Sequence, residues 1–301
     1  MDWITGMQRA IDYIEANLDG ELDYDDIARQ SCSSAYHFQR VFGILCGYTL
    51  GEYIRNRRLT LAGAELSGGG LRVIDAALKY GYDSPDSFGR AFRAFHGVTP
   101  SQARGGGVTL RSFSRLSVKI LLEGGNTMNY RIEEKPEMIL TGFRRHFDGV
   151  PYGELREKQE EHMFVTTRGG QWMLRGASNK PSIDYCVITD VGDDGYDFAI
   201  AATLDRWERD NINNPDVVGD EFAGRFENIV VPAHTYAVFE TERSRCPIPS
   251  YQDIRRQIVS EWLPVSGYQL SDAPEITAIH WRPSKDREQR YVEIWLPVEK
   301  K

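Results

Sequence analysis

The sequence predicts a multidomain protein: an all-α N-terminal domain with two helix-turn-helix motifs, then an α+β C-terminal domain of duplicated strand-helix-strand-strand units. Its 301 residues are enough for two domains of ordinary size. Before about residue 105, apolar residues recur at helical spacing, whereas β-rich runs dominate after about residue 128. Glycine-rich stretches lie between these regions, so we expect domains at 1–105 and 128–301 and a linker at 106–127.

The composition excludes several classes of protein. No apolar run approaches the roughly 18 residues of a membrane span, and the N-terminus lacks the basic and apolar regions of a signal peptide. The four cysteines form no CxxC pair, which is typical of a reducing compartment. We therefore expect a soluble cytoplasmic protein with no membrane partner.

The net charge of −8 is unevenly distributed. Residues 1–126 contain 14 basic and 14 acidic residues, and the remainder contains 22 basic and 30 acidic residues. Only the second half would be repelled by phosphate. Any DNA affinity of the first half must come from individually placed side chains rather than from bulk charge.

The N-terminal half contains an internal repeat at an offset of 50 residues. Residues 38–42 (FQRVF) match residues 88–92 (FGRAF), and a serine before and a glycine after each stretch also match. Each copy has the layout of a helix-turn-helix, with helices at 24–30 and 34–46, and again at 72–79 and 84–96. A connecting helix at 49–67 would span roughly 28 Å, close to one DNA turn of roughly 34 Å.

The second helix of each copy presents polar side chains opposite its phenylalanines. Helical spacing puts Tyr36, Gln39 and Arg40 on one face, and Asp86, Arg90 and Arg93 on the corresponding face of the other copy. Arginine can donate two hydrogen bonds to guanine, and glutamine can pair with adenine, so these faces suit the major groove. The alternative is an ordinary solvated face. On the connecting helix, one or two of Arg55, Arg57 and Arg58 are candidates for phosphate contact, and the rest for solvation or internal pairing.

The stretch KYGYDSPDSFGRAF at 79–92, followed by FHGVTP at 95–100, closely resembles the signature of AraC/XylS-type transcription regulators. The resemblance covers about residues 3–104 and implies a seven-helix domain that binds an asymmetric site on double-stranded promoter DNA. RNA polymerase is a further candidate partner. By position, the resemblance assigns base contacts to one group on each reading helix: Tyr36, Gln39 and Arg40 on the first, and Asp86, Ser87 and Arg90 on the second. Asp86 is an acid where some members have glutamine, so it would cap its helix or accept from cytosine.

The C-terminal half contains a weaker repeat at offsets of 95 and 96 residues. Strand-like runs at 136–143 and 232–239 are each followed by a helical stretch, at about 153–165 and 250–263. Two further strand-like runs follow in each copy, including 196–200 and 291–295. The recurring order predicts a duplicated α+β unit.

The last strand is the best candidate for a ligand site. Period-two alternation places Tyr291, Glu293 and Trp295 on one face, where an acid between two aromatic rings suits a cationic ligand with an apolar body. The alternative is an edge strand with an exposed glutamate. Tyr196 and Trp172 are further ligand candidates that could equally belong to the core.

The run YVEIWLPV at 291–298 resembles the end of GyrI-like effector-binding domains, and the resemblance covers about residues 129–299. It implies a pseudo-twofold fold with a cleft between two repeats, in which Glu293 matches an acid that meets hydrophobic, often cationic compounds. Some members sense drugs, and others hydrolyse reactive cyclopropane-containing compounds.

Sequence motifs for other chemistry are missing. The sequence has no GxxxxGK[ST], HExxH or GxSxG motif, and its six histidines lack metal-ligand spacing. We therefore predict no catalytic residue, metal or cofactor, and a transcription regulator that senses a small molecule rather than an enzyme. The alternatives are a C-terminal hydrolase of toxic electrophiles, or a module that sequesters ligand or protein. Two reading helices make a monomer sufficient and leave a homodimer open, and the choice between activator and repressor is also open.

Overall fold

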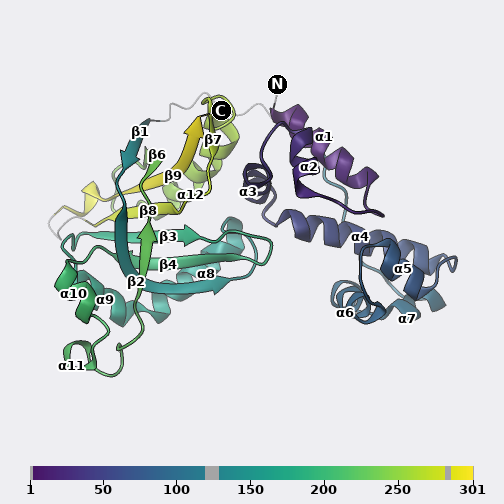
Figure 1. Ribbon diagram of the computed structural model, residues 1–301, viewed down its shortest axis with the longest axis horizontal. Coiled ribbons are helices and arrows are strands. Elements are labelled where there is room, and N and C mark those ends of the chain that lie inside the picture. The colour runs from purple at the N-terminus through teal and green to yellow at the C-terminus, as the bar shows by residue number, and fades with distance from the viewer. Residues whose placement is uncertain (1–2, 119–128, 282–285, 301) are drawn as a thin grey trace. The chain divides into compact units, whose positions relative to one another are not determined.

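The computed structural model describes residues 3–118, 129–281 and 286–300 (Figure 1). Its contacts divide the chain into two compact units, one with residues 1–39 and 48–122 and the other with residues 40–47 and 123–301. Helices come first and an antiparallel sheet with helices follows, which confirms the predicted fold class. Among the helices of the described ranges, none combines the length and apolar character needed to cross a bilayer.

The regular secondary structure of residues 3–105 is entirely helical. Its helices are α1 (Trp3–Ala16), α2 (Tyr24–Gln30), α3 (Ala35–Cys46), α4 (Leu50–Ser67), α5 (Val73–Lys79), α6 (Pro85–His96) and α7 (Pro100–Gly105). The two helix-turn-helix pairs, α2–α3 and α5–α6, lie within one or two residues of the predicted bounds. The connecting helix α4 also begins and ends where the sequence indicates.

Capping residues explain these helix bounds. Thr49 and Glu52 form a reciprocal capping box at the start of α4. The Ser84 side chain accepts a hydrogen bond from the Ser87 backbone at the start of α6, which ends at Gly97 in the left-handed conformation, at a φ of 80°. Local sequence therefore sets both ends of the second reading helix.

The paired phenylalanines of the repeat form the cores of the two helix-turn-helix motifs. Phe38 and Phe42 of α3, and Phe88 and Phe92 of α6, are at most 1% exposed. The α6 pair packs in a cluster that also contains residues of α4, α5 and α7. This packing fixes which face of α6 points outward.

Residues 108–118, which the sequence places in the linker, pack against the first unit. Val108 and Leu110 lie against the α6 core cluster. The backbone N–H groups of Phe113 and Leu116 donate to Thr60 and Tyr53 of α4 at 2.9 and 3.2 Å. This segment thus adds backbone hydrogen bonds to the helical unit.

The second unit is a curved antiparallel sheet with helices. Its strands are β1 (Tyr130–Lys135), β2 (Met138–Phe147), β3 (Ile183–Thr189), β4 (Tyr196–Ala202), β5 (Glu227–Val231), β6 (His234–Glu240), β7 (Tyr268–Leu270), β8 (Glu275–His280) and β9 (Tyr291–Lys300). The helices are α8 (Gly153–Thr166), α9 (Arg168–Ala177), α10 (Arg206–Asn211), α11 (Pro215–Val218), α12 (Ile248–Gln257), the π-helical η1 (Ile258–Trp262) and the 3-10 turn η2 (Arg287–Gln289).

The strand order shows the duplication directly. It runs β1-β6-β9-β8-β3-β4-β2-β5, so β6-β9-β8 in one half corresponds to β2-β4-β3 in the other. The two halves meet where β3 pairs with β8. Each half follows the predicted order of strand, helix, strand and strand, because β2-α8-β3-β4 recurs as β6-α12-β8-β9.

The two faces of this sheet have different surroundings. Figure 1 shows α8 behind β3 and β4, and Phe164 of α8 contacts Phe198 of β4 on that helix-covered face. The opposite, inner face carries a second core cluster with residues from β2, β3, β4, β5, β6, β8 and β9. This inner face contains three of the five predicted ligand-binding residues, Tyr291, Glu293 and Trp295.

Candidate functional site

Helix α6 presents polar side chains to solvent. Asp86, Arg90 and Arg93 are all exposed, opposite the buried Phe88 and Phe92. Within the described residues, neither arginine makes an ion pair or a side-chain hydrogen bond. Both guanidinium groups are therefore available to an external anion or base edge.

Ser87 has a different role in the structure. Its hydroxyl donates to the Ser84 carbonyl at 2.9 Å, and its backbone N–H donates to the Ser84 hydroxyl at 3.2 Å. The side chain is partly exposed. It contributes to the helix cap, and a base contact by Ser87 stays a prediction.

The corresponding residues of α3 differ in exposure. Tyr36 and Gln39 are partly exposed, whereas Arg40 is 3% exposed. A base contact by Arg40 would require this side chain to become accessible. Tyr36 and Gln39 are thus the more accessible candidates on the first reading helix.

The three arginines of α4 differ in their partners and in their exposure. Arg57 makes two hydrogen bonds of 2.8 Å to Glu15 and a third, of 2.6 Å, to the Phe113 carbonyl. Hydrogen bonding to Glu15 raises the pKa of Arg57. This arginine is used internally, which is the alternative that the sequence left open.

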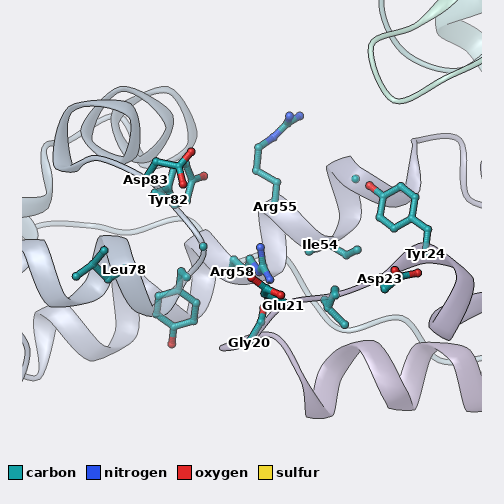
Figure 2. Close-up of a pocket in the computed structure, with 14 residues that line it drawn as sticks. Gly20, Glu21, Asp23, Tyr24, Ile54, Arg55, Arg58, Leu78, Tyr82 and Asp83 are labelled. Carbon is teal, nitrogen blue, oxygen red and sulfur yellow. Dashed lines mark hydrogen bonds between the residues drawn. The ribbon is translucent and has the colours of Figure 1, made fainter.

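Arg58 and Arg55 line a hollow of about 870 Å³ between the two helix-turn-helix motifs. Arg58 donates to the carbonyls of Leu18 and Gly20 at 2.9 and 2.5 Å, and burial lowers its pKa. Figure 2 shows Arg55 projecting from α4. Its side chain is 54% exposed and lies 4.0 Å from Glu52, so Arg55 is the most accessible cation of the three.

Glu293 lies on the inner face of the second unit, with its side chain 10% exposed. Arg131 donates to one of its carboxylate oxygens at 2.6 Å, and the Trp295 indole donates to the other at 2.9 Å. The His280 Nε2 atom lies 3.4 Å from the second oxygen. Each carboxylate oxygen thus accepts one hydrogen bond, and the His280 ring lies beside the second oxygen.

These contacts determine the charge of Glu293. Burial by itself would raise its pKa, but His280, Arg131 and Trp295 together lower the pKa to about 2. Glu293 is therefore ionised throughout the physiological pH range. A fixed negative charge beside aromatic rings is a suitable partner for an organic cation.

Aromatic rings surround this carboxylate. Trp295 lies with its ring centroid 6.1 Å from Tyr185 and 6.2 Å from Tyr236. Tyr291 stacks on His280 at 4.2 Å, with the rings 5° from parallel. The structure thus groups Tyr291, Glu293 and Trp295 around one face, as the alternation in the sequence indicates.

The structure does not bring the other two ligand candidates to this face. Tyr196 is completely buried on the helix-covered face, where its hydroxyl donates to Gln159 at 2.8 Å. Trp172 is 66% exposed on α9, beside Arg175. Neither residue shares the surroundings of Glu293.

Sequence reasoning missed several residues around Glu293. Arg131 and Lys135 of β1, His280 of β8, and Tyr185 and Tyr236 all lie on the inner face. One signal was available, because charged residues occupy every second position of β1 from 131 to 135. The strand partners of β1 could not be read from that pattern.

Acidic, histidine and cysteine side chains form no group of three that could hold a metal ion in the described ranges. The four cysteines are free thiols. Burial raises the pKa of Cys46 to about 12, which favours its thiol form.

Comparison with known proteins identifies both halves of the chain. A helix-turn-helix domain family matches residues 27–106, and the GyrI-like small molecule binding domain family matches residues 128–299. The HTH-type transcriptional activator AarP of Providencia stuartii is 49% identical over 31% of this chain and 68% of its own length. The regulatory protein SoxS of Salmonella typhimurium is 40% identical over 33% of this chain and 92% of its own. A solved structure, SAV2435 bound to tetraphenylphosphonium, is 16% identical with a TM-score of 0.43 and covers 57% of this chain and 94% of its own.

Proposed function

Because the chain belongs to the AraC-type DNA-binding transcription regulators with a GyrI-like small-molecule-binding domain, we propose that an effector bound beside Glu293 controls how α3 and α6 occupy a promoter. Two reading helices on one chain let a monomer contact two successive major grooves. The single observation that supports effector binding at this site is that the buried, ionised carboxylate of Glu293 lies among aromatic rings.

The DNA contacts follow from the exposed side chains. Arg90 and Arg93 on α6, and Tyr36 and Gln39 on α3, are the candidates for base contact. Arg55 is the candidate for a phosphate contact, because Arg57 and Arg58 are already bonded within the unit. RNA polymerase is a further candidate partner for a promoter-bound regulator of this kind.

The effector class follows from the inner face. A carboxylate beside Trp295 and Tyr185 favours a cation with a large apolar body, because the rings supply apolar contact and cation–π attraction. The effector changes promoter binding only if it has different affinities for two states of the protein.

Footprinting of the full chain on its promoter tests this proposal. We expect protection of two adjacent major-groove segments on one face of the duplex, and a change in that protection when effector is added. Protection of one groove alone, or none, would contradict the twin-helix model. A bound effector that leaves DNA affinity unchanged would indicate a sequestering module instead.

Product analysis separates sensing from turnover. If candidate effectors are recovered unchanged in stoichiometric amounts, the second unit acts as a sensor. Product that forms with the native chain and disappears with Glu293→Gln would indicate a hydrolase in which this carboxylate is essential.

A further inference from the structure

Strand β1 places two cationic side chains, those of Arg131 and Lys135, at the proposed effector site. It is an edge strand that pairs only with β6 among the described strands, and its register places Arg131 opposite Val238 and Glu133 opposite Tyr236. Val238 and Tyr236 belong to the inner-face cluster. Because alternate residues share a face, Arg131 and Lys135 point to that face as well.

The guanidinium of Arg131 contacts three carboxylates. It donates to Glu293 at 2.6 Å, to Glu240 at 2.5 Å and, from its Nε atom, to Glu133. The side chain of Glu293 is 10% exposed, whereas those of Glu240 and Glu133 are 33% and 31% exposed. One partner is therefore inside the site, and the other two are closer to solvent.

A bound cation could also use the face of the Trp295 ring, and Lys135 already occupies that face. Its ammonium lies 4.4 Å from the centroid of the Trp295 ring and also pairs with Glu133. Both the carboxylate and the aromatic face are thus already in contact with cations of the protein itself. A cationic effector must displace these contacts in order to bind.

We infer that Arg131 is a specificity-determining residue: it is a resident counter-ion that a cationic effector replaces at Glu293. The inference rests on the proposed function of the same site. A buried carboxylate without a partner has a high free energy. Glu293 therefore exchanges one cationic partner for another and does not lose its partner altogether.

The three-carboxylate arrangement makes this exchange feasible. Arg131 is 38% exposed, and when it leaves Glu293 it keeps Glu240 and Glu133 as partners. A small hydrated cation gains little by the exchange, because it has no apolar surface that could contact Trp295 and Tyr185. Arg131 therefore selects for cations that add a large apolar body.

Titration of the full chain with tetraphenylphosphonium, a lipophilic monocation, tests the inference by calorimetry. We expect Arg131→Gln to bind about 10-fold more tightly than the native chain, because the competing guanidinium is gone. We expect Glu293→Gln to bind at least 10-fold more weakly. In the double variant Arg131→Gln/Glu293→Gln, the gain should disappear, because the gain acts through Glu293.

Arg144→Gln is the matched control. Arg144 also bonds to two carboxylates of the same unit, Asp197 and Asp190, but it does not contact Glu293. It should bind the probe like the native chain, and thermal unfolding should show that all four variants are folded.

The outcomes distinguish this inference from the proposed function. If Arg131→Gln binds like the native chain while Glu293→Gln loses binding, the exchange is wrong and the effector site stands. A gain that persists in the double variant also overturns the exchange, since added negative potential alone would explain it. If no variant binds the probe, or if Glu293→Gln binds it like the native chain, the proposed cationic effector fails as well.

Discussion

The arginines of helix α6 and Arg131 on the inner face of the sheet differ in whether they are bonded to carboxylates. Arg90 and Arg93 are exposed and have no carboxylate partner among the described residues, whereas Arg131 is bonded to three carboxylates. The overall charges agree with this difference, because the first 126 residues are neutral and the rest carry the net charge of −8. An arginine without an internal partner is available to DNA, and a fully paired arginine serves structure or selects ligands.

Arg57→Met should have the largest effect of the variants. It tests whether this arginine of the first unit has a structural role rather than a role in DNA binding. The variant leaves Glu15, whose side chain is 9% exposed, without its guanidinium partner. We expect a loss of about 3 kcal/mol in the unfolding free energy of this unit, measured by urea denaturation. DNA affinity should be unchanged at temperatures where the variant is folded, and a selective loss of DNA affinity would contradict the internal role.

Arg90→Ala tests an exposed arginine, in contrast to Arg57, which is bonded within the unit. We expect a loss of roughly 1–3 kcal/mol in discrimination between promoter and random DNA, with little change in stability, because the side chain is exposed. Competition binding assays measure the discrimination. Arg206, which is 88% exposed on α10 of the second unit, supplies a matched control. Equal losses on both DNAs would assign Arg90 to phosphate instead.

Arg55→Ala should have a smaller and sequence-independent effect. Loss of one phosphate contact should weaken binding to every DNA by the same factor and reduce the slope of log affinity against log salt by about 1. The measurement is a salt titration of promoter and random DNA. An unchanged slope would mean that Arg55 lies outside the DNA contact.

The pH dependence of effector binding should be the smallest effect. Glu293 has a pKa of about 2, below its ordinary value of 4.5, so it stays ionised above that pKa and loses its charge only as the pH falls towards 2. Calorimetry should therefore show no loss of affinity for a permanent cation with a midpoint near the ordinary pKa of Glu293. A loss of binding with a midpoint near pH 4.5 would mean that Glu293 lacks the lowered pKa.

His96 gives the stability of the first unit a dependence on pH. Its ring nitrogens contact the Leu59 carbonyl and the Arg111 backbone N–H, and burial lowers its pKa below 6.5. The unfolded chain therefore binds a proton at a higher pH than the folded chain. The associated stability is complete above about pH 6.5 and is lost as the pH falls below it, towards the folded pKa.

Local patterns predicted most of the secondary structure. The capping residues Thr49 and Ser84 and the stop at Gly97 set helix bounds within one or two residues, because caps act on adjacent backbone groups. Period-two alternation in β9 also placed Glu293 and Trp295 on one face. The same alternation could not show that Tyr196 belongs to the helix-covered face, since both faces of a buried strand are apolar.

The sequence by itself determined the elements, the two repeats and the family, because each of these depends on spacing along the chain. The tertiary structure decided which charged groups are paired. Arg57 meets Glu15 across 42 residues, and Arg131 meets Glu293 across 162 residues. Long side chains find partners by proximity in space, so only the folded chain separates exposed arginines that are available to DNA from arginines that bind the protein's own carboxylates.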